Sequence, residues 1–173
     1  MLIRQHKFTY SLHNNANFVL LIIYTQYAMI KLLYTEVDGM DITVAHVAIY
    51  TEDLERSRCF YEKYFNAKSN QKYENTSGFS SYFLKLNDHV SLELMSHTDL
   101  EHRDVIDKTN GISHIAFSVG SKENVIALTN QIVADGYNLL SPIRYTGDGY
   151  FESCIADPDG NRIRVIQDSS ILQ

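Results

Sequence analysis

An internal repeat is the feature that most limits the folds open to this chain of 173 residues. The segment AHVAIYTEDLE, which begins at Ala45, matches SHIAFSVGSKE, which begins at Ser113, and SLELM at 91–95 matches RIRVI at 162–166. In each copy a β-forming segment is followed by a helical pattern and then by three further β-forming segments. The sequence therefore predicts an α+β fold built from two βαβββ modules.

Each module is expected to carry one helix near its start. Module one spans about residues 42–97, and Thr51 or Asp53 is the expected N-cap of its helix. Module two spans about residues 111–167, and Ser121 is the expected N-cap there. Alternating β-forming residues and Asn, Gly and Asp turns then predict three strands after each helix. These strands are expected at residues 67–73, 80–86 and 90–96, and at residues 137–145, 150–156 and 162–167.

Strand alternation places four polar side chains on the face of the sheets that the core does not need. In the first strand of module one, His46 points away from the apolar side chains that alternate with it. The same counting puts Glu93, His114 and Arg164 on the equivalent face. If the two sheets join and curve, this face becomes a concave cleft, so these four residues form the candidate site.

These residues resemble the vicinal oxygen chelate superfamily, which includes glyoxalase I, fosfomycin and bleomycin resistance proteins, methylmalonyl-CoA epimerase and extradiol dioxygenases. The resemblance covers about residues 42–167 and rests on His46, Glu93, His114 and the ending DPDGNRIRVI at 157–166. It is closest to small bacterial glyoxalase-like proteins. The resemblance implies paired βαβββ modules whose mixed and antiparallel strands curve into a cup around a divalent metal.

The resemblance also implies the metal ligands and one departure from the family pattern. It assigns His46, Glu93 and His114 as ligands, with Glu93 also in a catalytic role, and nickel or zinc, or else iron or manganese, as the metal. The family's fourth ligand is a glutamate, and this chain has Arg164 there. At about 4 Å and an effective dielectric near 20, a guanidinium repels a divalent ion by about 8 kcal/mol. Arg164 is therefore expected to swing away, to pair with Glu93 without a metal, or to hold an anionic substrate.

Two functions remain open on these residues. The first is a metal-dependent lyase or isomerase of the glyoxalase I type, similar to lactoylglutathione lyase, acting on a small oxygenated substrate that Arg164, Arg144 and Tyr150 contact. The second is a metal-free protein that binds or sequesters a small molecule, as in the bleomycin-resistance branch. Two-module chains of this family usually build their cups with a second chain, so the expected assembly is a homodimer.

Composition favours a small-molecule ligand over a macromolecular partner. The chain has 21 acidic and 15 basic residues, a net charge of -6 and no cluster of basic residues, which argues against nucleic acid and anionic membranes. Its two cysteines, Cys59 and Cys154, are too few and too far apart for a zinc knuckle or a disulfide framework. They are expected to be buried thiols of a reducing compartment, so the expected location is the cytoplasm.

The first 39 residues differ in character from the rest. Residues 8–30 contain no Asp, Glu, Lys or Arg, but the continuous apolar run FVLLIIY at 18–24 is much shorter than the ~20 residues of a membrane span. Met40 directly precedes the repeat-containing domain, residues 40–173. We expect residues 1–39 to be a leader or upstream extension that this domain does not need, with a peripheral element or a targeting segment as the alternatives.

Overall fold

The computed structural model describes residues 23–27, 41–102 and 110–168. Contacts divide the chain into two units, Met1–Ile42 and Thr43–Gln173, and the second unit is the one described below. Residues 23–27 are helical, and the other residues of the expected leader lie outside the described part, so the leader stays a prediction. Within the residues that the structure describes, no helix is long and apolar enough to cross a membrane.

Module one forms a mixed sheet with one helix. The strands stand in the order β1-β5-β4-β2, with β3 also paired to β4. β1 runs parallel to β5, and the other pairs are antiparallel. The elements are β1 (His46–Tyr50), α2 (Leu54–Phe65), β2 (Lys68–Ser69), β3 (Tyr73–Glu74), β4 (Phe79–Lys85) and β5 (Ser91–His97).

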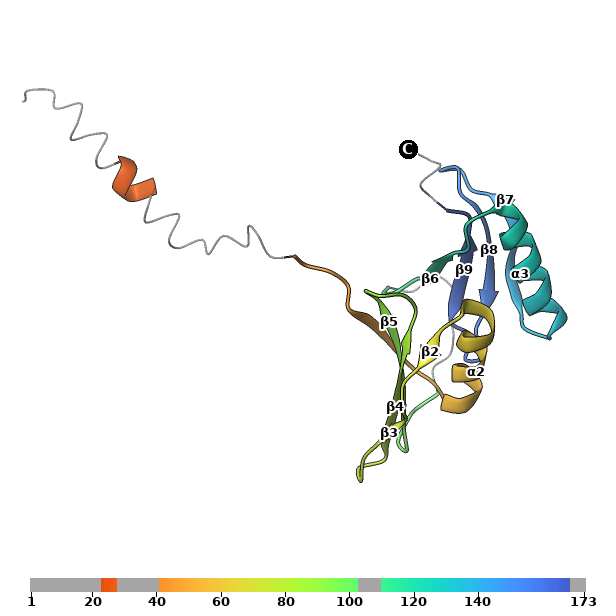
Figure 1. Cartoon of the computed structure of the whole chain (residues 1–173), viewed down its shortest axis with the longest axis horizontal. Helices are drawn as coiled ribbons and strands as arrows, with labels where there is room; N and C mark the ends of the chain where they lie inside the picture. The colour runs from red at the N-terminus through yellow and green to blue at the C-terminus, as the bar shows by residue number, and fades with distance from the viewer. Residues whose placement is uncertain (1–22, 28–40, 103–109, 169–173) are drawn as a thin grey trace, which may run out of the picture. The chain divides into compact units, whose positions relative to one another are not determined.

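Module two repeats this plan, as the sequence predicted. Its strands stand in the order β6-β9-β8-β7, and the first strand again runs parallel to the last. Ala48 faces Glu93 in module one, and Ala116 faces Arg164 in module two, so the registers are equivalent. The elements are β6 (Ile115–Ser118), α3 (Lys122–Ala134), β7 (Leu139–Tyr145), β8 (Phe151–Ala156) and β9 (Arg162–Ile166). Figure 1 shows the two modules in one domain.

Both helices begin at side chains that cap them. The Asp53 carboxylate accepts the backbone N–H of Arg56 at 3.0 Å, so Asp53 rather than Thr51 is the N-cap of α2. The Ser121 hydroxyl accepts the backbone N–H of Asn124 at 3.2 Å at the start of α3. At the end of α2, Asn66 adopts the left-handed conformation with φ 52°, which stops the helix.

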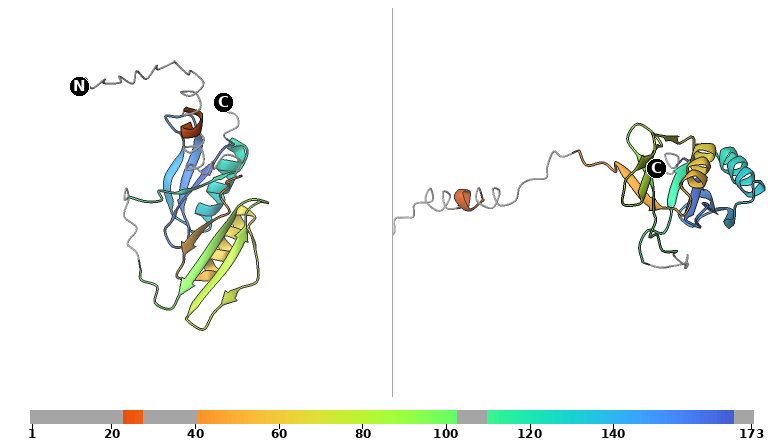
Figure 2. Two further views of the ribbon diagram at one scale, coloured as in Figure 1. Left: turned by 90° about the vertical axis from the view of Figure 1, so that its left-hand side faces the viewer. Right: turned by 90° about the horizontal axis from the view of Figure 1, so that it is seen from below.

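One face of each sheet is buried against a helix. α2 packs on β4 and β5, and α3 packs on β7, β8 and β9 (Figures 1 and 2). The modules share one core, in which Phe65 of α2 lies 4.1 Å, ring centre to ring centre, from Phe117 of β6. The fully buried side chains include Phe60, Tyr61, Leu84, Leu92, Leu94, Val125, Ile132, Ile155, Ile163 and Val165. The opposite face of each sheet is therefore left for polar side chains.

One expected strand is broken in the structure. The segment expected as a strand at residues 67–73 forms two short strands, β2 and β3. Asn70 lies between them, and its side-chain oxygen accepts the backbone N–H of Phe83 at 2.8 Å while its own N–H donates to the Phe83 carbonyl at 3.0 Å. This side-chain bond replaces a ladder bond and interrupts the strand.

The prediction that both cysteines are buried is wrong for Cys59. Cys154 is buried in β8, but Cys59 is exposed on α2. The buried stripe of α2 runs through Ser57, Phe60 and Tyr64, and Cys59 lies on the other side of the helix.

Candidate functional site

His46 and Glu93 meet on the open face of the module-one sheet. The His46 Nε2 lies 3.7 Å from the Glu93 Oε2, with 46% of the histidine side chain and 15% of the glutamate side chain exposed. The His46 ring also meets the Phe83 ring edge-on at 5.4 Å between centres. Because Ala48 is the residue opposite Glu93 in the parallel ladder, His46 is its diagonal neighbour on the same face. The pair can hold and transfer a proton.

A recess adjoins this pair. It has a volume of about 380 Å³, and Phe83 and Ser91 are among its lining residues. Phe83 contacts the His46 ring, and Ser91 is the residue opposite His46 in the ladder. Lys68, Lys85 and Asp88 also line the recess, and Lys85 pairs with Asp88 at 2.9 Å, so its charges are mixed. A small molecule held there would lie beside His46 and Glu93.

His114 lies just before β6 and is partly buried. Burial, followed by the positive charge of Arg164, lowers the pKa of His114 below its usual value of 6.5. Its Nδ1 lies 3.1 Å from the Ser113 hydroxyl. At neutral pH the imidazole is therefore uncharged and is available as a hydrogen-bonding group or as a metal ligand.

Arg164 pairs with a residue that the sequence analysis did not single out. Its Nη1 donates to the Glu152 Oε2 at 3.0 Å, and Arg144 Nη2 donates to the other oxygen of the same carboxylate at 3.3 Å. Glu152 is only 2% exposed. The described ion pairs thus join Arg164 to Glu152 of the neighbouring strand and not to Glu93.

The sequence contains a feature that could have identified Glu152. It is an acidic residue in a strand of otherwise small and apolar residues, and it shares the face of Arg164 by strand alternation. Its direct partner across β7 is Arg144. Charged residues inside strands are seldom buried without a partner of opposite charge, so Glu152 needs such a partner.

Tyr150 ends the turn between β7 and β8. The backbone N–H of Tyr150 donates to the Thr146 hydroxyl at 2.8 Å, and Gly149 has φ 94°, a conformation that favours glycine. Tyr150 lines a small recess of about 120 Å³ together with Lys122 and Tyr145. Its predicted contact with substrate stays a prediction.

Within the described residues, one chain does not bring together the donors that a metal centre needs. His46 and Glu93 are neighbours, whereas His114 has the cationic Arg164 beside it on the other sheet. Across residues 23–27, 41–102 and 110–168, no group of three or more His, Cys, Asp or Glu side chains could hold a metal ion. The donors that the described part of one chain brings together therefore do not fit the metal that the resemblance implies.

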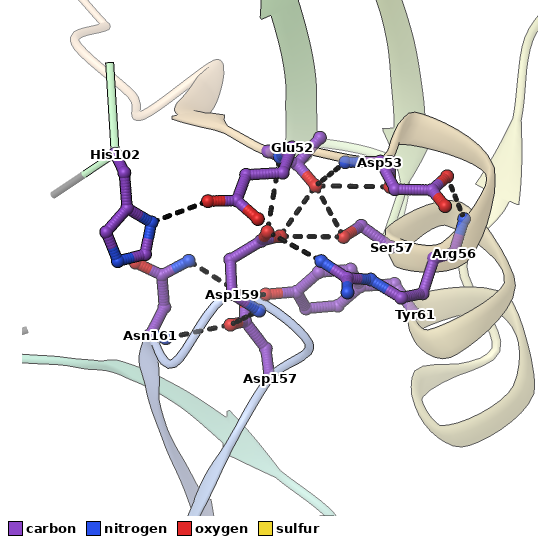
Figure 3. Close-up of polar contacts among 10 residues, drawn as sticks. Glu52, Asp53, Arg56, Ser57, Tyr61, His102, Asp157, Asp159 and Asn161 are labelled. Carbon is purple, nitrogen blue, oxygen red and sulfur yellow. Dashed lines mark hydrogen bonds and ion pairs between the residues drawn. The ribbon is translucent and has the colours of Figure 1, made fainter. Parts of the chain in front are cut away.

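A polar joint holds the two modules together (Figure 3). Asp159, in the turn between β8 and β9, accepts hydrogen bonds at the start of α2 from the hydroxyls of Thr51 at 2.6 Å and Ser57 at 2.9 Å. It also pairs with Arg56 at 2.9 Å and accepts the Glu52 backbone N–H at 3.2 Å. The DPDG motif thus fastens module two to the first turn of the module-one helix.

Asp157 belongs to the same joint and is held by two side-chain hydrogen bonds. Its Oδ2 accepts the hydroxyl of Tyr61 at 2.8 Å and the side-chain amide of Asn161 at 2.9 Å. Burial raises the pKa of Asp157 above its usual 3.8, although these hydrogen bonds act in the opposite direction. Burial, with the Asp157 charge, likewise raises the pKa of Tyr61 well above 10. Nearby, the His102 Nδ1 lies 2.6 Å from the Glu52 carboxylate.

Comparisons with known proteins agree with this architecture. An uncharacterised protein of Bacillus subtilis, YqjT, is 28% identical over 132 residues, which cover 72% of this chain and 98% of YqjT. A glyoxalase, bleomycin resistance protein and dioxygenase domain from Frankia sp. EAN1pec has a TM-score of 0.64 at 19% identity, over 74% of this chain and 98% of that one. The trypanothione-dependent glyoxalase I of Leishmania major has a TM-score of 0.61 at 20% identity, over 76% of this chain and 91% of that one.

The solved structures show the fold, which is the curved two-module α+β fold that the sequence predicted. A family model matches residues 43–165, which is both modules and most of the chain. On these grounds the chain belongs to the Glyoxalase/Bleomycin resistance protein/Dioxygenase superfamily.

Proposed function

We propose that this protein is a lyase or isomerase of the glyoxalase type, acting on a small oxygenated molecule in a cup shared by two chains. One chain would supply His46 and Glu93, and a second chain would supply His114 and Arg164. The observation that carries the proposal is the register: the repeat puts these pairs at equivalent positions on two sheets, and each sheet holds only half of the set. The similarity to glyoxalase I structures supports the reaction type.

Two unpaired sheet edges support the homodimer. β1 and β6 each stand at the end of their sheet within the described domain. Apolar side chains are exposed on or beside these strands, among them Val44 at 61%, Tyr50 at 52% and Ile112 at 79%. An exposed strand edge next to apolar side chains is a surface that pairs readily with a second chain. Such pairing would cover these side chains and complete the cup.

The proposed chemistry uses the residues of the chain itself. Glu93 would take a proton from the hydroxyl-bearing carbon next to a carbonyl group and return it to the carbonyl carbon. The hydroxyl proton would pass to the former carbonyl oxygen, so that substrate and product are isomers. His46 would orient the Glu93 carboxylate. His114 and Arg164 would hydrogen-bond to the substrate oxygen that becomes negatively charged between the two steps.

A metal-dependent lyase is the second candidate, because His46 and Glu93 are donors of the type that nickel and zinc accept and lie 3.7 Å apart. His114 of a second chain would be the third ligand. When bound, the metal would supply a Lewis acid beside the substrate oxygen. Binding is expected to be weak, because Arg164 places a positive charge beside His114.

Proton exchange measured by NMR tests the proposal. Wild-type protein in heavy water, incubated with small 2-hydroxy and 2-oxo acids or with the adduct of methylglyoxal and a thiol, is expected to exchange the proton next to the carbonyl of one of them. Glu93→Gln should abolish the exchange, because an amide is not a base. Glu74→Gln is the matched control, since Glu74 is 62% exposed and pairs with Lys72.

The same experiment separates the alternatives. Exchange that survives a chelator supports the proposed chemistry, and exchange that a chelator abolishes and nickel or zinc restores supports the metal-dependent candidate. Binding of one of these molecules without any exchange would contradict both and support the metal-free sequestering function. Exchange that is equally fast in Glu93→Gln would show that Glu93 is not the base.

A further inference from the structure

Two guanidinium groups share one buried carboxylate on the module-two sheet. Arg144 stands directly opposite Glu152 in the ladder, and Arg164 reaches the same carboxylate from β9. Glu152 is 2% exposed, whereas 48% of the Arg144 side chain and 34% of the Arg164 side chain are exposed. Each guanidinium has five N–H donors, and the bond to Glu152 uses only one or two of them. The arrangement therefore presents two anchored, partly exposed donor groups.

Carboxylates partly balance the charges of these arginines. Glu152 cancels one of the two positive charges. Asp148, in the turn before β8, is exposed. The pKa of Asp148 is lowered first by the Thr146 hydrogen bond and, to a smaller extent, by Arg164 and Arg144. The Asp148 carboxylate therefore interacts electrostatically with both arginines. Because Glu152 and Asp148 offset part of the positive charge, a doubly charged ligand would gain little over a singly charged one.

We propose that Arg144 and Arg164 bind the carboxylate of a small oxygenated acid, and that Glu152 makes this subsite select a singly charged carboxylate over a doubly charged phosphate. The inference rests on the proposed function and names its substrate class. A guanidinium matches the planar carboxylate with two parallel hydrogen bonds. Glu152 is a positioning and specificity-determining residue in this scheme, because it fixes both arginines and removes the charge that a phosphate would need.

NMR titration of the full-length protein with glycolate and with inorganic phosphate tests this inference, at a pH of about 8 where the doubly charged phosphate ion predominates. Wild type is expected to bind glycolate at least about tenfold more tightly than phosphate. Arg164→Met should weaken glycolate binding at least about tenfold, whereas Arg58→Met should leave it unchanged because Arg58 pairs with Glu55 and Glu62 elsewhere. Glu152→Gln should shift the ratio of the two affinities at least about tenfold toward phosphate.

A second variant tests the same inference if the Glu152→Gln protein does not fold. Asp148→Asn removes an exposed charge near the same arginines and should shift the ratio in the same direction by about threefold. A wild type that binds neither probe, or that prefers phosphate, would overturn the inference, as would an unchanged ratio in a folded Glu152→Gln protein. These residues belong to one sheet of one chain, so this binding is measurable even if the exchange test or the shared cup fails.

Discussion

Arg164 and Glu152 form an ion pair between neighbouring strands, with 3.0 Å between the guanidinium Nη1 and the carboxylate Oε2. Arg164 occupies the register position in module two that Glu93 occupies in module one. The two modules therefore present opposite charges at equivalent places. The acid–base pair His46 and Glu93 lies on one sheet, and the cationic group lies on the other.

Removal of the Glu152 carboxylate should destabilise the domain. Glu152→Ala leaves two guanidinium groups side by side without their shared partner, and we expect a loss of about 2 kcal/mol. This value is below the range for fully buried pairs, because both arginines are partly exposed. Urea unfolding followed by circular dichroism measures the change.

Arg144→Met is the matched control for that variant. It leaves Glu152 paired with Arg164, so the expected loss is under about 1 kcal/mol. A Glu152→Ala protein as stable as wild type would mean that the bridge contributes nothing to folding.

His114 should titrate below 6.5 in the folded protein, because burial and then Arg164 lower its pKa. The unfolded chain then binds the proton more tightly, so this histidine makes folding less favourable as the pH falls below about 6.5. Arg164→Met should raise the pKa only in part, since burial is the larger cause. NMR titration of the imidazole protons measures both values, and a wild-type pKa at or above 6.5 would contradict the described environment.

The joint between the modules depends on Asp159. Asp159→Ala removes its bonds to Thr51, Ser57 and Arg56. The two hydroxyls keep their contact with each other, and Thr51 keeps its bond to the Asp53 carbonyl, but both lose the charged acceptor. We expect a loss of about 2 to 3 kcal/mol in the free energy of unfolding. Urea unfolding followed by tyrosine fluorescence reports on the core around Tyr61.

Asp88→Asn is the control for the joint. Asp88 is 88% exposed and pairs only with Lys85 among the described contacts, so the unfolding midpoint should not move. Equal stability of Asp159→Ala and Asp88→Asn would show that the joint does not hold the modules together.

The strand faces of the candidate residues could be predicted from local rules. Strand alternation with a period of two put His46 and Glu93 on one face, and the repeat carried that assignment to His114 and Arg164. The N-caps Asp53 and Ser121 could also be predicted, because a helix cap depends on only a few neighbouring residues.

Long-range partners could not be predicted in this way. The pairing of Arg144 with Glu152 depends on the register of β7, which shifts twice between Leu139 and Arg144. The contact of Asp159 with Thr51 joins residues far apart in the chain, and only the packing of α2 brings them together. Neither register shifts nor the placement of one module on another follows from the periodicity of a strand.

Arg164→Glu should convert the site toward metal binding. The variant removes the positive charge and puts a carboxylate next to the buried Glu152, so the two negative charges favour a cation between them. We expect nickel or zinc to bind weakly to wild type and at least about tenfold more tightly to the variant, which is ~1.4 kcal/mol. Calorimetric titration measures both affinities, and equal values would mean that Arg164 does not face the metal position.

Cross-linking between chains tests the shared cup most directly. In a Cys59→Ser background, which removes the exposed native thiol, a His46→Cys chain and an Arg164→Cys chain are mixed, allowed to exchange and treated with a short bis-maleimide. If His46 of one chain faces Arg164 of another, the mixture gives a covalent dimer of one chain of each kind, at twice the mass of the 19.9 kDa chain. A cross-link that forms only inside a chain carrying both cysteines, with none between chains in the mixture, would contradict the shared cup.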